Sequence, residues 1–389
     1  MIPPGACLGL LGGGQLGRMF TMAAQSMGYR VMVLDPGGHS PAGSVADRHV
    51  KTDYLDPAGL AELARACAAV TTEFENVPAE ALDRLARTCV VSPGAASVAV
   101  SQDRIREKRF LAASGLGTAR FAVIERRDDL GPELDSRLLP GILKRSRFGY
   151  DGKGQVRVTT REQAMAAFLA LGEEPCVLEQ LLPLDLELSV VVARGFDGAL
   201  NTFALAENIH AQGVLDVSIV PARVPETLAA EAREAAITVA EKLDYRGVLC
   251  IEFFVVEGDR LLANEIAPRP HNSGHFSIDA CFTSQFEQQA RVMAKLPLGD
   301  PGLHCPAVMV NILGDAWHAG EPRWESVLVH PRAKLHLYGK RDARPGRKMG
   351  HYTVLGDDVE ANLKLALEIK RALLAPVTAA VRDAAQGAA

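Results

Sequence analysis

The sequence has no surplus of positive charge. Its 42 Lys and Arg residues are outnumbered by 47 Asp and Glu residues, which gives a formal net charge of −5. Binding to nucleic acid or to an anionic membrane surface usually needs a basic excess, so this balance argues against both. The chain also lacks an apolar run of roughly 18 residues, which a membrane helix requires. Its N-terminal residues lack the basic and apolar segments of a secretory signal.

Cysteine is sparse and follows no pattern. The seven cysteines are scattered, their number is odd, and no Cys-x-x-Cys occurs. This usage predicts neither a disulfide framework nor a zinc site. Most of them stand in apolar runs, where a thiol behaves as a small buried hydrophobic group. We therefore expect a globular protein of the reducing cytoplasm.

At 389 residues the chain exceeds what one compact core usually accommodates, so two or three domains are expected. Residues 1–100 alternate short apolar strands with helices. The expected strands are 7–11, 29–34 and 69–72, and the expected helices are 16–27, 60–67 and 79–86. This alternation predicts an α/β, Rossmann-like domain whose parallel sheet binds ligands outside the carboxyl ends of its strands.

Residues 101–298 follow a different pattern. A polar helix is expected at 101–113 with Ser101 as its N-cap. Later strands are joined by short polar turns, which indicates an α+β domain with antiparallel pairing. The expected strands are 141–144, 155–159, 175–180, 186–193 and 249–256, and the expected helices are 162–171 and 226–243. Segment 296–302 resembles a linker to a small β-rich C-terminal domain, residues 299–389, with a helix at 359–373.

A glycine-rich turn follows the first strand. Residues 12–17 (Gly-Gly-Gly-Gln-Leu-Gly) match G-x-G-x-x-G, and Asp35 ends the next strand. This combination is typical of NAD-dependent oxidoreductases, in which the acid binds a ribose. The physical reason is more general, because glycines let a helix N-terminus approach any phosphate. The turn predicts phosphate binding, with a ligand-free tight turn and a dinucleotide site as alternatives.

A β-hairpin is expected near residue 258. Residues 247–256 and 261–266 are apolar strands, and Gly258-Asp259 between them is a suitable two-residue loop. In that hairpin Glu257 pairs with Arg260, and this pairing sets the register of the two strands.

The register places two acids side by side. It sets Phe253 opposite Asn264 and Glu252 opposite Glu265, with Cβ atoms roughly 4.5–5.5 Å apart on one face. Two such carboxylates repel unless a cation lies between them or one is protonated. Oxygen ligands favour Mg²⁺ or Mn²⁺, so the pair predicts a metal site that also binds nucleotide phosphates. Solvated acids on an exposed hairpin face are the alternative.

Two further segments suggest anion binding. The glycine-rich loop at residues 149–154 follows the strand that contains Lys144, and glycine amides with lysines suit phosphates. The nucleoside-triphosphate P-loop pattern is absent, and a ligand-free flexible turn is the alternative. Downstream of Glu265 stand Arg269 and His271, whose donors suit a small oxyanion beside a metal-bound phosphate.

These motifs, in this order, resemble the ATP-grasp superfamily of carboxylate–amine ligases over essentially the whole chain. Within it the sequence is similar to the 5-(carboxyamino)imidazole ribonucleotide synthetase family. The similarity is carried by residues 14–19 (GQLGRM), 72–77 (TEFENV), 149–154 (GYDGKG), 267–275 (APRPHNSGH) and 344–351 (RPGRKMGH). One departure is Ala267, where many superfamily members have Asn, which leaves a third protein ligand for the metal open.

The resemblance implies an ATP-grasp fold between a Rossmann-like domain and a small β-rich domain. It also implies ATP-dependent carboxylation of 5-aminoimidazole ribonucleotide by bicarbonate, through carboxyphosphate, in purine biosynthesis by a cytoplasmic homodimer. The ATP contacts that it implies are Arg104, Lys144, Gly149, Tyr150, Asp151, Gly152, Lys153, Gly154, Glu179, Gln180, Leu181, Leu182, Glu187 and His210. The implied Mg²⁺ ligands are Glu252, Glu265 and Asn264.

For the ribonucleotide the resemblance implies seven further residues. They are Gln15, Leu16, Glu73, Asn272, Lys340, Arg347 and Lys348, with the last three on the 5′-phosphate. Arg269 and His271 are expected to orient bicarbonate together with Lys153. The loop around Tyr150 is expected to close the site, because carboxyphosphate is labile in water. Asp151 is the expected proton acceptor.

Competing functions predict different residues or reactions. A formate-dependent ligase that acts on glycinamide ribonucleotide shares the fold, but its glycine turn resembles Gly-x-Gly-Glu-Leu-Gly, and residue 15 here is Gln. A biotin-dependent carboxylase subunit is usually longer. An NAD-dependent oxidoreductase would form no ADP, and a regulatory nucleotide-binding protein would show no hydrolysis stimulated by the ribonucleotide.

Overall fold

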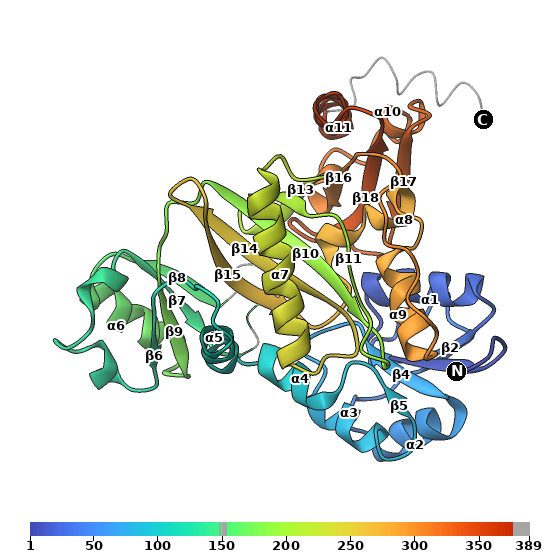
Figure 1. Cartoon of the computed structure of the whole chain (residues 1–389), viewed down its shortest axis with the longest axis horizontal. Helices are drawn as coiled ribbons and strands as arrows, with labels where there is room; N and C mark the ends of the chain where they lie inside the picture. The colour runs from blue at the N-terminus through green and yellow to red at the C-terminus, as the bar shows by residue number, and fades with distance from the viewer. Residues whose placement is uncertain (148, 150–153, 376–389) are drawn as a thin grey trace.

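The computed structural model describes residues 1–147, 149 and 154–375, in which the strands form three sheets (Figure 1). Of the expected ATP-binding loop, Tyr150, Asp151, Gly152 and Lys153 lie outside the described residues. Among the helices that are described, none is long and apolar enough to cross a membrane.

The N-terminal sheet is parallel and has the order β3-β2-β1-β4-β5. Its strands are β1 Cys7–Leu11, β2 Arg30–Leu34, β3 Arg48–Val50, β4 Ala69–Thr72 and β5 Val90–Val91. Its helices are α1 Gln15–Ser26, α2 Pro57–Ala66, α3 Ala79–Leu85 and α4 Ala95–Ser101. The strand order reverses between β1 and β4, and a ligand crevice is expected where such a reversal occurs. The glycine turn after β1 and Glu73 after β4 meet there.

A small antiparallel sheet forms the second layer of the middle region. Its order is β6-β9-β7-β8, and its strands are β6 Phe121–Ile124, β7 Gly141–Arg145, β8 Gln155–Val158 and β9 Cys176–Gln180. Helix α6 (Arg161–Ala170) buries Phe168 against it, and α5 (Arg104–Ala113) lies between this sheet and the larger one. In Figure 1 this green unit stands apart from the N-terminal sheet.

The largest sheet has nine strands, and its pairings are antiparallel. Its strands are β10 Leu186–Arg194, β11 Leu200–Thr202, β12 Ala206–Ala211, β13 Val214–Val220, β14 Gly247–Val256, β15 Arg260–Ala267, β16 Ala307–Leu313, β17 Ala333–Leu337 and β18 Lys348–Leu355. Its helices are α7 Glu226–Lys242, α8 Ser277–Ala280, α9 Gln285–Met293, α10 Glu325–Leu328 and α11 Val359–Leu374. Strands β16 to β18 extend the sheet beyond β13, so the C-terminal strands share a sheet with the middle region.

The two faces of this sheet differ where β10 and β14 pair. Leu188, Val190 and Ile251 point to one face, where α7 covers them (Figure 1). Because side chains alternate along a strand, the neighbouring positions point to the other face. There Ser189 lies opposite Glu252. Polar residues such as Ser189 and Glu252 therefore lie on the face turned away from α7, beside a second apolar cluster, and the candidate site is built on them.

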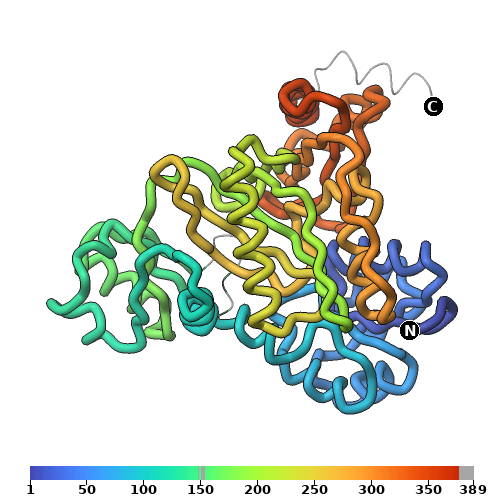
Figure 2. Tube along the Cα trace, in the orientation of Figure 1, coloured from blue at the N-terminus to red at the C-terminus, as the bar shows by residue number. Residues whose placement is uncertain are grey.

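Helix α9 connects the middle region to the N-terminal sheet. Phe286, Ala290 and Met293 of α9 share a buried cluster with Met19 and Phe20 of α1. Figure 2 shows the orange tube of α9 beside the blue tube of α1. This packing keeps the start of α1, and with it the glycine turn, next to the residues that follow β15.

The expected start of the helix at residue 101 is wrong. Ser101 is the last residue of α4, and α5 begins at Arg104 with Asp103 as its N-cap. The Asp103 carboxylate accepts from the N–H groups of Ile105 and Arg106 at 3.1 and 3.2 Å. A carboxylate at this position satisfies amides that the helix leaves open and favours the positive end of the helix dipole.

The prediction of a two-residue hairpin loop is also wrong, although the predicted pairing of the two acids is correct. The turn has three residues, because Val256 pairs with Arg260, and Glu257 adopts φ +57°. Phe253 therefore lies opposite Ala263 rather than Asn264. A β-bulge between Glu252 and Phe253 then shifts the register by one residue.

The bulge leaves Asn264 as the extra residue on β15 and restores the register. Glu252 lies opposite Glu265, as the sequence predicts. The longer turn and the bulge each shift the register by one residue, in opposite directions, and the two shifts cancel. The predicted register of the two acids is therefore confirmed, whereas the loop that was expected to set it does not form.

Candidate active site

Each of the two opposed acids has its own cationic partner. Glu252 Oε1 lies 2.9 Å from His271 Nε2, and Glu265 Oε2 accepts from Arg104 Nη1 over 3.2 Å. Burial alone would raise the pKa of Glu252, but His271, His210 and Lys348 outweigh it and hold the pKa at about 2. Glu252 is therefore a carboxylate at neutral pH, available to a cation.

A buried charge cluster joins α5 to the small sheet. Glu179 on β9 lies 3.1 Å from Lys144 on β7 and 3.3 Å from Lys108 on α5, and its side chain is only 3% exposed. Burial alone would raise the pKa of Glu179, but Lys108 and Lys144 outweigh it, so the pKa falls to about 2. The electrostatic influence of Glu265 and Arg104 also reaches Lys144. The cluster therefore borders the acid pair.

Arg269 links the residues after β15 to the N-terminal sheet. Its guanidinium donates to the carboxylate of Glu75, and its Nη1 donates to the Pro270 carbonyl over 3.1 Å. Burial alone would lower the pKa of Arg269, but Glu75, Glu73 and Glu265 raise it well above its ordinary value. Arg269 therefore remains a fixed cation between the glycine turn and the acid pair.

Carboxylates occupy the glycine turn. Glu73 accepts from the N–H groups of Gly14 and Gly17 at 2.7 and 3.0 Å, and Asp35 accepts from the N–H group of Gly13 at 2.9 Å. A Cβ atom on Gly14 would lie 2.6 Å from Glu73 Oε1, so this glycine is needed for the approach of a side chain. Burial raises the pKa of Glu73.

This arrangement contradicts the dinucleotide alternative. The turn amides that would bind a pyrophosphate already donate to Asp35 and Glu73. Asp35 also accepts from the hydroxyl of Tyr54 at 2.9 Å, so it is committed within the domain rather than available to a ribose. Both oxygens of Glu73 are engaged by helix amides, and its expected contact with the ribonucleotide stays a prediction.

Residues far apart in sequence meet at the start of α1. The Lys340 ammonium donates to Gln15 Oε1 and, over 2.6 Å, to the carbonyl of Lys348. Leu16, the next residue of α1, is buried. The structure thus brings together four of the residues expected to bind the ribonucleotide. Arg347 differs, because its Nη1 donates to the Asp342 carbonyl over 2.9 Å at the surface.

Asn272 is a buried polar residue whose side chain is not satisfied within the described part of the chain. It is buried, with 5% exposure, and neither its amide oxygen nor its amide nitrogen has a hydrogen-bond partner among the described residues. A buried polar group without a partner costs about 1–3 kcal/mol. Such a group is expected to be satisfied by a ligand that binds beside it.

The remaining expected ATP contacts lie on or beside the two sheets. His210 Nδ1 lies 2.9 Å from Glu187 Oε2 on the large sheet. After β9, the N–H groups of Gln180 and Leu181 donate to carbonyls within the protein, and Leu182 is half-buried. Gly149 and Gly154, which flank the residues outside the described range, follow Lys144 on β7. Their contacts with ATP stay predictions.

Two residues of the site were not singled out by sequence reasoning. Lys108 stands one helical turn after Arg104, so the i, i+4 spacing could have placed both on the side of α5 that faces the site. Glu75 belongs to the 72–77 segment, and its partner Arg269 is 194 residues away. No local pattern indicates that pair.

The residues present suit a Mg²⁺ or Mn²⁺ ion. Among the described residues, no group of three or more His, Cys, Asp and Glu side chains could hold a metal on its own. Mg²⁺ in nucleotide sites is commonly held by one or two carboxylates with the phosphates as further ligands. Glu252 and Glu265 provide such a pair. The Asn264 carbonyl accepts from Lys108 over 2.9 Å, and its contact with a metal stays a prediction.

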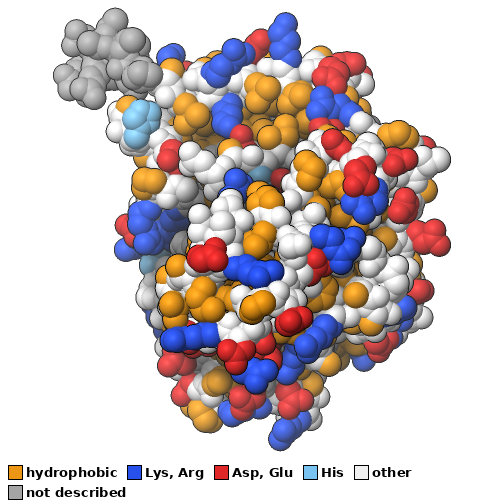
Figure 3. Space-filling model, turned by 90° about the vertical axis from the view of Figure 1, so that its left-hand side faces the viewer, with side chains coloured by type: hydrophobic (Ala, Val, Ile, Leu, Met, Phe, Trp, Pro, Cys, Tyr) orange, Lys and Arg blue, Asp and Glu red, His pale blue; other side chains and the backbone are white. Residues whose placement is uncertain are grey.

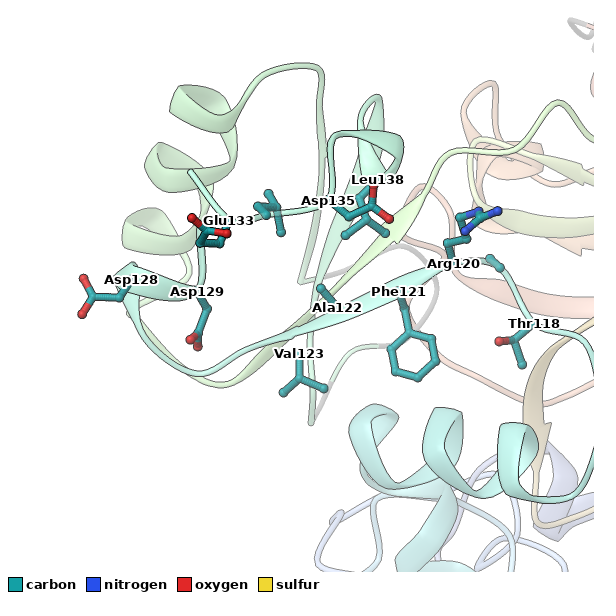
Figure 4. A pocket seen from close by; sticks show the side chains of 12 residues that line it. Thr118, Arg120, Phe121, Ala122, Val123, Asp128, Asp129, Glu133, Asp135 and Leu138 are labelled. Carbon is teal, nitrogen blue, oxygen red and sulfur yellow. The ribbon is translucent and has the colours of Figure 1, made fainter. Parts of the chain in front are cut away.

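One cavity of about 620 Å³ lies on β6 of the small sheet, and its lining includes none of the expected site residues (Figure 4). Asp128, Asp129, Glu133 and Asp135 line it. Asp129 already accepts from two backbone N–H groups at 2.8 Å, and four carboxylates disfavour a polyphosphate. On the face of the molecule in Figure 3, acidic and basic side chains are interspersed rather than separated by sign.

Glu107 supplies a pH-dependent prediction. Burial and the nearby Glu265 raise the pKa of Glu107 to about 8, above its ordinary value of 4.5. Folding therefore binds a proton between these values, and stability should fall as pH rises through that window. Glu107→Gln keeps the acceptor for the Ile266 N–H group and removes this dependence.

The variant should gain stability relative to the wild type as pH rises from about 5 to about 8, by at most about 1.4 kcal/mol per pH unit. Urea unfolding at several pH values, with EDTA present, measures the difference. A difference that does not change with pH would show that Glu107 ionises normally.

Three family models match consecutive parts of the chain. They describe a ribonucleotide synthetase preATP-grasp domain over residues 6–102, an ATP-grasp domain over 109–286, and a phosphoribosylaminoimidazole carboxylase C-terminal domain over 307–364. The chain is also 46% identical over 354 residues to the N5-carboxyaminoimidazole ribonucleotide synthase of Brucella melitensis, a match that covers 90% of this chain and 97% of that protein. The chain belongs to the N5-carboxyaminoimidazole ribonucleotide synthase family.

Other members of the N5-carboxyaminoimidazole ribonucleotide synthase family are also similar to this chain in sequence and in structure. The Bacillus subtilis enzyme is 41% identical over 91% of this chain and 93% of its own length. The Staphylococcus aureus synthetase with ADP has a TM-score of 0.88 at 36% identity, covering 95% of this chain and 98% of that one. An Aspergillus clavatus synthase in complex with ADP and 5-aminoimidazole ribonucleotide has a TM-score of 0.83 at 29% identity, covering 94% and 99%. The expected ATP-grasp fold is confirmed, and the chain is an ATP-dependent ligase.

Proposed function

We propose that the site converts ATP, bicarbonate and 5-aminoimidazole ribonucleotide into ADP, phosphate and the N5-carboxylated ribonucleotide of purine biosynthesis. The reaction is the one named by the family. One observation carries the assignment to these residues. The acid pair, the Arg269–His271 segment and the Gln15–Lys340 contact converge from three parts of the chain.

ATP lies between the small and large sheets in this proposal. Lys144 and Arg104 bind its phosphates, Glu179 and the chain after it border the adenine, and Glu187 binds the ribose. Glu252 and Glu265 hold Mg²⁺ or Mn²⁺. When bound, the ion would offset the negative charge of the phosphoryl oxygens.

Bicarbonate binds next to Arg269 and His271. One of its oxygens attacks the γ-phosphorus of ATP, the bond to the ADP oxygen breaks, and carboxyphosphate forms. Arg269, held in place by Glu75, stabilises the negative charge of the oxyanion. The amine of the ribonucleotide then attacks the carboxyl carbon, or CO₂ released beside it, while phosphate leaves and the amine loses a proton. Lys153, Tyr150 and Asp151 lie outside the described residues, and their expected roles stay predictions.

The ribonucleotide binds at the start of α1. Asn272 supplies both a donor and an acceptor that have no partner in residues 1–147, 149 and 154–375, and Gln15 and Lys340 meet at the N-terminus of α1. Lys340 and Lys348 bring positive charge suited to a 5′-phosphate. We also propose that the enzyme works as a homodimer in the cytoplasm, as the resemblance implies.

The reaction is tested by measuring ADP release with bicarbonate, with and without 5-aminoimidazole ribonucleotide. Rapid release that requires both substrates supports the proposal. Formate and glycinamide ribonucleotide in their place should give no activity. Release driven by formate would overturn the assignment in favour of the formate-dependent ligase.

Lys340→Ala should weaken binding of the ribonucleotide. The lost hydrogen bond of a charged group corresponds to about 1.5–3 kcal/mol, so the KM for 5-aminoimidazole ribonucleotide should rise roughly 10- to 100-fold. The KM for ATP should not change, because Lys340 lies on the α1 side of the site. Lys334→Ala is the matched control, since Lys334 is an exposed lysine on β17, the strand that precedes Lys340. An equal change in both variants would remove Lys340 from the site.

A further inference from the structure

His271 is held at both ring nitrogens and at its backbone. Nε2 lies 2.9 Å from Glu252 Oε1, and Nδ1 lies 2.8 Å from Ser273 Oγ. The Gln285 side chain accepts from the His271 N–H group over 2.8 Å and donates to its carbonyl over 2.7 Å. Ser273 and Gln285 are both fully buried. The two hydrogen bonds from Gln285 fix the position of the His271 backbone, and the contact with Ser273 fixes the orientation of the ring.

Behind Ser273 a relay of buried side chains crosses the large sheet. Ser218 donates to Asn208 Oδ1 over 2.8 Å, Asn208 Nδ2 donates to Ser189 Oγ over 2.8 Å, and Ser189 donates to Ser273 Oγ over 2.7 Å. Because His271 is the cationic partner of Glu252, both of its ring nitrogens carry protons, so Nδ1 donates to Ser273 Oγ, and this oxygen accepts from Ser189 as well. The four relay residues are at most 6% exposed, so water does not compete for these bonds.

The relay and the acid pair share one face of the sheet. Ser189 lies directly opposite Glu252, and Glu252 lies opposite Glu265. Asn208 lies opposite Ser218 on one side and opposite Glu187 on the other, so this second row is offset from the first along β10, on the same face. A shift in the relay would therefore turn the His271 ring with respect to the same carboxylate that it contacts.

We propose that Ser273 is a positioning residue of the carboxylation reaction. The relay Ser218–Asn208–Ser189–Ser273 fixes the His271 ring so that Nε2 faces Glu252 at the bicarbonate end of the site. This inference rests on the role proposed above for His271. The relay ends at the ring, and Ser189 reaches the ring only through Ser273, so both serines act on the reaction through His271. Displacing a reacting or orienting group by about 1 Å can cost up to 10²-fold in rate.

Ser273→Ala and Ser189→Ala should lower kcat for bicarbonate-dependent ADP release by about 10- to 100-fold, the range found for residues that orient a ligating histidine. The KM for ATP should stay within about twofold, because neither serine is among the groups assigned to the nucleotide. Ser97→Ala is the matched control. Ser97 of α4 is also buried, but it donates to the carbonyl of Leu243 at the end of α7, outside the relay, so the kcat of this variant should be normal.

A double-mutant cycle separates positioning from folding. In a His271→Ala background, Ser273→Ala should have no further effect, and in a Ser273→Ala background, Ser189→Ala should have none. Equal losses in both backgrounds would mean that the serines act through stability, and the inference would be overturned.

The single variants separate the two proposals. Loss of turnover in His271→Ala together with normal turnover in Ser273→Ala would also overturn the inference, while leaving the role of His271 intact. Normal turnover in His271→Ala would instead overturn the role proposed for His271 under the proposed function.

Discussion

Replacing Arg269 with alanine should lower kcat for bicarbonate-dependent ADP release by at least about 10²–10³-fold, the usual cost of losing one well-placed oxyanion donor. Arg269 is fixed by Glu75, and in the same segment Asn272 has a buried amide with no partner among the residues that the structure describes. The nucleotide contacts assigned to Lys144 and Arg104 do not depend on Arg269. The dissociation constant for ATP, measured by calorimetry, should therefore stay near the wild-type value.

Arg246→Ala is the matched control for this variant. Arg246 also lies in an ion pair, with Asp244, but outside the site. Its loss should leave kcat near normal. Near-normal turnover in Arg269→Ala would show that bicarbonate is oriented by other groups, and weakened ATP binding would place Arg269 on the nucleotide instead.

Removing the charge from the acid pair should have the second large effect. Glu252→Gln and Glu265→Gln keep the size of each side chain but remove the negative charge that a divalent ion needs. Each should raise the Mg²⁺ concentration required for half-maximal activity and lower turnover, by about 10²-fold or more if the ion offsets the charge of the phosphoryl oxygens.

Glu257→Gln controls for a general effect of charge on the same hairpin. Glu257 lies in the turn, with a side chain that is 70% exposed and paired with Arg260. Its Mg²⁺ dependence should match the wild type. If Glu252→Gln also has wild-type Mg²⁺ dependence, Glu252 is not a metal ligand, and its contact with His271 is its main role.

The hairpin shows how far local patterns reach. Alternating apolar residues around Gly258 predict two paired strands, and these form as β14 and β15. The turn geometry and the bulge at Asn264 depend on packing that the sequence does not display, because Lys108 of α5 binds the carbonyl of the bulged residue. The acids face each other although the loop expected to set their register does not form.

The glycine turn shows the opposite case. Its spacing indicates phosphate binding, but the groups that approach the amides are Asp35 and Glu73. Glycine allows a close approach of any negative group, so the spacing does not identify that group. Because Glu73 follows a strand 59 residues away, only the pairing of β1 with β4 brings it to the turn.

The longest contacts could not be derived from local chemistry. Lys340 and Gln15 are 325 residues apart, and only the resemblance to the family connected them before the structure did. The relay behind His271 joins three strands of the large sheet, β10, β12 and β13, to the short helix that contains Ser273. No shared sequence motif indicates this connection. The expected division of the chain at residues 100 and 298 stays a prediction.

The most direct measurement follows Mn²⁺ binding by electron paramagnetic resonance in the presence of ADP. If the opposed acids hold a divalent ion against the nucleotide, the wild type and Glu257→Gln should bind one Mn²⁺ tightly when ADP is present. Glu252→Gln and Glu265→Gln should bind it at least about tenfold more weakly, a change of roughly 1.4 kcal/mol. Equal Mn²⁺ affinity in all four proteins would contradict a metal site built on this pair.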